Sequence, residues 1–160
     1  MNKLIKISFL LDGRMFSVET KSDRRLLDIL REDAGITGVR EGCGEGECGA
    51  CSIFFNGRLA NSCCIPAIAA EGAEIDTIDG FSKTEEYSII SQAFADAGAV
   101  QCGFCTPGFI MASAALLREN PRPTDNEIKI GLSGNLCRCT GYTMIIEAVR
   151  LASGRMARNV

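Results

Sequence analysis

Nine cysteines among 160 residues constrain this chain more than any other feature, because thiols at suitable spacing hold metal centres or form disulfides. Histidine is absent, which excludes Ser-His-Asp catalysis, HExxH metallohydrolases and Rieske centres. The first residues carry a Lys inside a short apolar run and no small-residue cleavage site, so we expect no secretory signal. We therefore expect a cytoplasmic protein that uses its cysteines to bind metal.

The composition is typical of a globular protein that does not bind nucleic acid. The chain is 46% hydrophobic, and no apolar run approaches the roughly 18 residues of a membrane span. Its formal net charge is −3, whereas a nucleic-acid partner would require a basic face. These values predict one or two globular domains.

The first half has the alternation and turn signals of a β-rich domain. Asp12-Gly13 and Asn56-Gly57 are favoured hairpin turns, and each lies between two apolar runs. A short helix around 26–30 is expected to end at Gly35. The predicted strands cover residues 3–11, 15–20, 52–55, 58–60 and 74–78.

In the second half, apolar residues recur at helical spacing. The predicted helices lie around 89–97, after Thr106-Pro107, after the capping box at 124–127 and after Gly141. The pattern predicts an α+β fold in which residues 1–80 form a β-grasp-like domain and residues 81–160 form a four-helix domain.

Four cysteines of the first half have the ligand spacing of a plant-type [2Fe–2S] centre. Cys43, Cys48, Cys51 and Cys63 form C-x4-C-x2-C-x11-C, whereas zinc sites usually pair their ligands as C-x2-C. A loop that wraps an anionic cluster needs close backbone approach, which the glycines between 42 and 49 permit. The spacing predicts that these four thiolates hold a [2Fe–2S] cluster.

The same loop contains the nucleotide-like motif G-x-G-x-x-G over residues 44–49. A dinucleotide site needs this motif between a strand and a helix, and here Glu45 and Glu47 would repel phosphate. We therefore interpret both carboxylates as part of a solvated or partner-facing loop.

Four cysteines of the second half form C-x2-C-x31-C-x-C and predict a second metal centre. Cys102 and Cys105 precede one predicted helix, and Cys137 and Cys139 precede another. Helix N-termini stabilise thiolates and anionic clusters, so these two helix starts can form a second cage for a metal centre. A structural zinc site held by four cysteines is the alternative that spacing leaves open.

Cys64 is left over, next to Cys63. Free cysteines are usually interior, so we expect Cys64 to be a buried small apolar residue. Spacing alone does not decide which of the two neighbours is the fourth ligand.

Four motifs together resemble the small iron–sulfur subunit of molybdenum hydroxylases, the family of xanthine dehydrogenase, nicotinate dehydrogenase and molybdenum carbon monoxide dehydrogenase. They are Glu41 to Cys51, Ser62-Cys63, Gly98 to Gly108, and Gly134 to Tyr142. The resemblance covers essentially the whole chain and implies a plant-ferredoxin-like domain whose cluster faces a flavin. It also implies a helical domain whose buried cluster lies beside molybdopterin, with Gln101 and Cys139 in contact with the pterin.

The resemblance implies an electron-transfer subunit that carries single electrons from molybdenum through two [2Fe–2S] clusters to a flavin. The chain contains no catalytic constellation, and we expect a separate molybdopterin-binding large subunit and a separate FAD-binding medium subunit. A stand-alone ferredoxin-like carrier and a zinc scaffold are the alternatives. We also expect the two clusters to differ in potential, because one lies in a solvent-side loop and the other at buried helix starts. The substrate of the whole enzyme is not encoded in this chain.

Overall fold

The computed structural model describes residues 4–158. Lys3, the first residue of one predicted strand, lies outside the described residues, as do the outer ends of the two predicted domains. The boundary at residue 80 stays a prediction.

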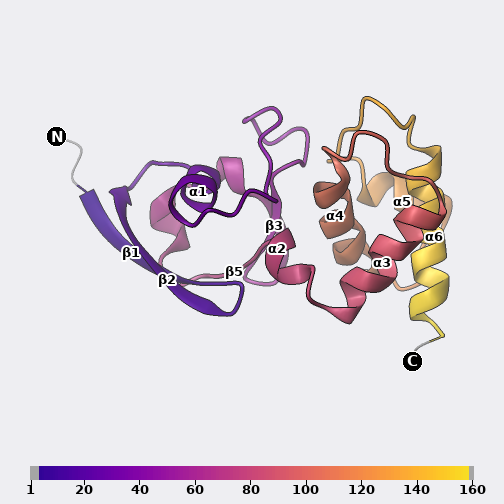
Figure 1. The fold of residues 1–160 in the computed structure, drawn as a ribbon, viewed down its shortest axis with the longest axis horizontal. Coiled ribbons are helices and arrows are strands. Elements are labelled where there is room, and N and C mark those ends of the chain that lie inside the picture. The colour runs from indigo at the N-terminus through magenta and orange to yellow at the C-terminus, as the bar shows by residue number, and fades with distance from the viewer. Residues whose placement is uncertain (1–3, 159–160) are drawn as a thin grey trace.

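The first half forms a five-stranded mixed sheet (Figure 1). Its strands are β1 (Leu4–Leu11), β2 (Arg14–Lys21), β3 (Ser52–Phe55), β4 (Arg58–Asn61) and β5 (Glu74–Asp76). The order is β2-β1-β5-β3-β4, with β1 and β5 parallel and the other neighbours antiparallel. Both predicted hairpin turns are present, and their four central residues have φ between +48° and +76°, as type I′ turns require.

A short helical segment packs its apolar side chains against this sheet. It consists of α1 (Leu26–Asp28) and the π-helical turn η1 (Ile29–Asp33). Leu26 and Leu30 of this segment are fully buried in one core with Phe9 of β1. Each such side chain contributes about 1.5–3 kcal/mol through burial. A helix packed on a mixed sheet gives the ferredoxin-like half that the sequence predicts.

The last strand is shorter than predicted, because Thr77 starts a helix instead of continuing β5. The Thr77 hydroxyl accepts a hydrogen bond from Asp79 N–H at 3.2 Å and donates to the Asp12 carboxylate at 2.7 Å. This N-cap opens α2 (Ile78–Phe81). The prediction of a strand as far as Ile78 was therefore wrong.

The second half is helical, and the α+β fold class is confirmed. Its helices are α3 (Glu85–Asp96), α4 (Thr106–Glu119), α5 (Asp125–Gly131) and α6 (Thr143–Met156). The predicted capping box is present at α5, where Thr124 and Glu127 exchange hydrogen bonds. The N-cap of α4 is Cys105, which places a candidate ligand at the helix start.

The two halves share apolar contacts. Phe54 of β3 is buried in the core of the helical half, together with Phe94 and Phe109. The Arg118 guanidinium of α4 lies over Phe54, 4.3 Å from the ring centroid. Among the described residues, no helix is long and apolar enough to cross a membrane.

Candidate metal centres

Three cysteines of the first thiol group lie on the loop between η1 and β3, which stands beside the helical half (Figure 1): Cys43, Cys48 and Cys51. The fourth, Cys63, follows β4. The Cys43 sulfur accepts hydrogen bonds from the backbone N–H groups of Glu45 and Glu47, each at 3.4 Å. Cys43 N–H points in turn at the Cys48 sulfur, 3.3 Å away. The Glu45 N–H in particular lowers the pKa of Cys43 to about 7. The loop therefore stabilises negative charge on sulfur.

Two glycines allow this loop to close on its sulfurs. A Cβ at Gly42 would lie 2.7 Å from the Cys48 sulfur, and a Cβ at Gly46, whose φ is +84°, would lie 2.8 Å from the Cys64 sulfur. Arg25 fixes the start of the loop by donating to Glu41 at 2.6 Å. Larger residues at either glycine would fill the space beside a sulfur.

Cys51 and Cys63 complete the first group from inside the protein. Both are buried. Burial in particular raises the pKa of Cys63, and the neighbouring Cys51 thiol adds to this rise. Cys64 is exposed, so our prediction of a buried apolar residue was wrong. Cys63 and Cys64 lie on the 3₁₀ turn η2 (Ser62–Cys64), where consecutive side chains point about 120° apart, so one faces the core and the other solvent.

The second thiol group lies where the loops before α4 and α6 meet. The Cys102 and Cys139 sulfurs are 3.7 Å apart, although 37 residues separate them in the sequence. Cys105 and Cys137 complete this group, with the Cys137 thiol close enough to affect the pKa of Cys105. Burial, reinforced by Cys137, raises the pKa of Cys105 to about 12. The structure thus brings together all four cysteines that the second spacing motif predicted.

Tyr142 and Thr140 shape the surroundings of Cys137. Burial opposes ionisation of Cys137, but hydrogen bonds led by the Thr140 hydroxyl, 3.1 Å from the sulfur, lower its pKa to about 7. Cys137 N–H donates to the Tyr142 hydroxyl at 3.0 Å. Tyr142 has φ +70° and packs edge-on against Phe109, with the ring centroids 6.3 Å apart. No sequence pattern assigned these roles to Thr140 and Tyr142.

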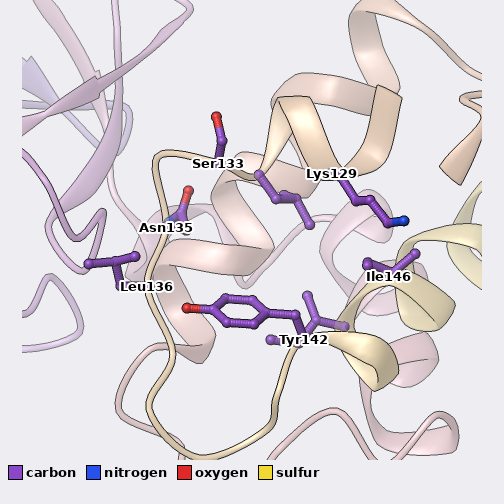
Figure 2. Close-up of a pocket in the computed structure, with 8 residues that line it drawn as sticks. Lys129, Ser133, Asn135, Leu136, Tyr142 and Ile146 are labelled. Carbon is purple, nitrogen blue, oxygen red and sulfur yellow. The ribbon is translucent and has the colours of Figure 1, made fainter. Parts of the chain in front are cut away.

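An apolar pocket of about 240 Å³ lies beside the second group (Figure 2). Figure 2 shows the Tyr142 ring reaching across it, with the hydroxyl toward Leu136. The lining residues come from α5, α6 and the segment between them: Lys129, Leu132, Ser133, Asn135, Leu136, Tyr142, Ile145 and Ile146.

The second group is not the more buried of the two in this chain. Cys102 and Cys139 are exposed, and Cys105 and Cys137 are half-buried, whereas the first group includes two buried cysteines. The expectation of buried helix starts was therefore wrong for the chain by itself. Both loops lie at one end of the helical half, where they contact the loop of Cys48 and leave Cys102 and Cys139 exposed.

Backbone and side-chain hydrogen bonds join the two thiol-bearing regions directly. Leu136 N–H donates to the Cys48 carbonyl at 3.0 Å, and the buried Asn135 amide donates to the Gly49 carbonyl at 3.2 Å. The Arg40 guanidinium donates to the Gly103 carbonyl and lies 5.6 Å from the Phe104 ring centroid. These contacts fix the separation of the two groups.

The arrangement of the thiols fits binuclear clusters. Two thiolates on one tetrahedral metal with metal–sulfur bonds of about 2.3 Å lie about 3.8 Å apart, which matches the 3.7 Å between Cys102 and Cys139. Within residues 4–158, no three His, Cys, Asp or Glu side chains form a group that could hold one metal ion. A [2Fe–2S] cluster takes two thiolates on each iron. The Cys102 and Cys139 sulfurs are close enough to share one iron, and the Cys63 sulfur lies at the same 3.7 Å from that of Cys64.

Comparison with known proteins identifies the family. A model described as "2Fe-2S iron-sulfur cluster binding domain" matches residues 9–75, and one described as "[2Fe-2S] binding domain" matches residues 77–150. The nicotinate dehydrogenase small FeS subunit of Eubacterium barkeri is 52% identical over 157 residues, which cover 98% of this chain and 99% of that protein. The chain belongs to the small iron–sulfur subunits of the molybdenum hydroxylases.

Other members of this family agree in sequence and structure. The xanthine dehydrogenase iron-sulfur-binding subunit of Escherichia coli O157:H7 is 46% identical over 92% of this chain and 94% of that protein. The crystal structure of quinoline 2-oxidoreductase from Pseudomonas putida 86 superposes with a TM-score of 0.89 at 38% identity, over 97% of each chain. The chain is therefore an electron-transfer subunit of an oxidoreductase, with two [2Fe–2S]-binding domains.

Proposed function

We propose that eight thiolates hold the two clusters and that electrons pass between them inside this chain. Cys43, Cys48, Cys51 and Cys63 would hold the first cluster, and Cys102, Cys105, Cys137 and Cys139 the second. This assignment is supported by the contact between the Cys102 and Cys139 sulfurs and by the N–H groups that point at Cys43 and Cys48. When bound, a [2Fe–2S] cluster takes up and releases one electron at a time.

The chain's own contribution is to fix where the two centres lie and to adjust their potentials. Leu136 is adjacent to Cys137, and its N–H donates to the carbonyl of Cys48. One hydrogen bond therefore connects a ligand of one centre to the neighbour of a ligand of the other. Hydrogen bonds to the sulfurs of Cys43 and Cys137 stabilise negative charge and so tune the potential.

Exposed apolar side chains around the second thiol group support the role of a subunit over that of a free carrier. Phe104 is 46% exposed and Leu136 is 54% exposed, and each is adjacent to a cysteine of this group. Val100, Tyr142 and Met144 are also exposed. Large apolar side chains gathered at one surface mark protein contacts. A molybdopterin-binding large subunit would cover this surface and bury the second centre.

The exposed residues of both thiol groups indicate where the remaining contacts would form. Gln101 and Cys139 are exposed, so both are free to contact the pterin of the large subunit. The loop with Cys43, Glu45 and Glu47 is exposed on the first half and would face the FAD-binding medium subunit. Nine cysteines that form no disulfide favour a reducing, cytoplasmic location.

Purification of the native complex through a tag on this chain tests the proposal. We expect a larger chain with molybdenum and a chain with FAD to co-purify. Hydrogen exchange at 98–105 and 134–144 should then be slower in the complex than in the separated chain. A chain that purifies alone and exchanges electrons with a soluble protein would show instead that it is a free carrier.

A further inference from the structure

We propose that Cys64 is a reserve ligand of the first cluster, able to take the place of Cys63. This inference rests on the proposed function, because it takes Cys63 as the resident ligand. It concerns the ninth cysteine, which is not among the eight proposed ligands of the two clusters.

The two neighbouring sulfurs lie as far apart as two thiolates on one iron. The Cys63 and Cys64 sulfurs are 3.7 Å apart, the same distance as between Cys102 and Cys139, which we assign to a common metal. Two thiolates on a tetrahedral metal lie about 3.8 Å apart. The Cys64 sulfur therefore lies 3.7 Å from the position that Cys63 would leave when it releases an iron.

The Cys64 sulfur also lies beside the loop that carries Cys43, Cys48 and Cys51. A Cβ at Gly46 of that loop would lie 2.8 Å from the Cys64 sulfur. Asn61 holds this loop in place by donating to the Gly46 carbonyl at 2.7 Å. The Cys64 sulfur thus lies next to the loop that would hold the first cluster. Because the Cys64 side chain is exposed, it is free to rotate.

The exchange requires no oxidant or reductant. The Cys64 thiol loses its proton to solvent as its sulfur–iron bond forms, and the departing Cys63 thiolate takes up a proton as its own bond breaks. Charge and electron count at the iron stay the same, because one thiolate replaces another. Cys48 has no such neighbour in the sequence and provides a matched comparison.

The decisive experiment compares iron content and EPR spectra of Cys63→Ser, Cys63→Ser/Cys64→Ser and Cys48→Ser in the full chain. We expect about four irons for Cys63→Ser, with an altered first-cluster signal, and about two for each of the other proteins. A Cys63→Ser protein that falls to the iron count of the double variant would overturn the reserve role. Retention of four irons by Cys48→Ser would instead contradict the ligand assignment, so the two failures are distinguishable.

A second measurement does not depend on the folding of Cys63→Ser. The first cluster of wild type and of Cys64→Ser is bleached with an iron chelator, and the decay of its visible absorption is followed. We expect several-fold faster loss in Cys64→Ser, because iron released by Cys63 is then not recaptured. Equal rates would contradict the proposal.

Discussion

Gly108→Ala tests the contact that holds the two thiol-bearing regions together. Gly108 lies in the first turn of α4, and a Cβ there would overlap the carbonyl oxygen of Gly49 and lie 3.1 Å from its carbonyl carbon. The overlap is with backbone, which cannot move aside as a flexible side chain would. The substitution must therefore push α4 away from the loop that carries Cys43, Cys48 and Cys51.

The size of the effect follows from three terms. Overpacking a close contact costs about 1–3 kcal/mol, and loss of the Asn135–Gly49 hydrogen bond costs about 1 kcal/mol. The higher helix propensity of alanine returns about 1 kcal/mol. We expect a net loss of about 2 kcal/mol, or about 4–8 °C in the apparent Tm of a chain of this size.

Thermal unfolding measured by circular dichroism and by cluster absorbance gives the result directly. Gly154→Ala is the matched control, because it is also a helical glycine but a Cβ there meets no atom within 4 Å. We expect Gly154→Ala to raise the Tm slightly. If Gly108→Ala were as stable as Gly154→Ala, the argument for a close contact between the two regions would be refuted.

Three further predictions concern single residues. Cys48→Ser should remove the first cluster and about two irons per chain, while circular dichroism shows the helical half still folded. Cys137→Ser should remove the second cluster and lower the thermal stability of the helical half, since metal binding contributes to folding. If Cys48→Ser and Cys137→Ser both kept the iron content of the wild type, the ligand assignment would be refuted. Glu127→Gln tests the pH dependence of stability. Hydrogen bonds from Thr124 lower the pKa of Glu127 in the folded protein. The ionised Glu127 side chain therefore stabilises the fold at pH values above its ordinary pKa of 4.5, and this contribution is lost as the pH falls through the lowered pKa. The Tm difference between wild type and Glu127→Gln should therefore shrink on acidification, and a constant difference from pH 7 to pH 3 would contradict this.

The elements set by local sequence were predictable. Type I′ turns require positive φ at two successive residues, so Asn56-Gly57 indicated both a hairpin and its register. The capping box at Thr124 similarly marked the start of α5. In both cases neighbouring residues alone determine the geometry.

The contacts between the two halves left no such signal. Leu136 and Cys48 are joined by a hydrogen bond between backbone groups, which any residue except proline could form. Arg40 reaches Gly103 across 63 positions. The spacing of the cysteines showed which thiols gather, but only the folded chain shows how the two groups adjoin.

Two predictions about exposure failed because burial depends on the whole fold. A buried position was assigned to Cys64 from the average behaviour of free cysteines, but a 3₁₀ turn sends neighbouring side chains in different directions. Burial of the second thiol group was implied by the family resemblance, but its helix starts lie at one end of the helical half, where the chain by itself leaves two cysteines exposed.

Metal and acid-labile sulfide analysis of the purified native protein tests the central claim most directly. The account predicts about four irons and about four sulfides per chain, with two distinct EPR signals after reduction. Zinc in place of iron, with no sulfide, would contradict it.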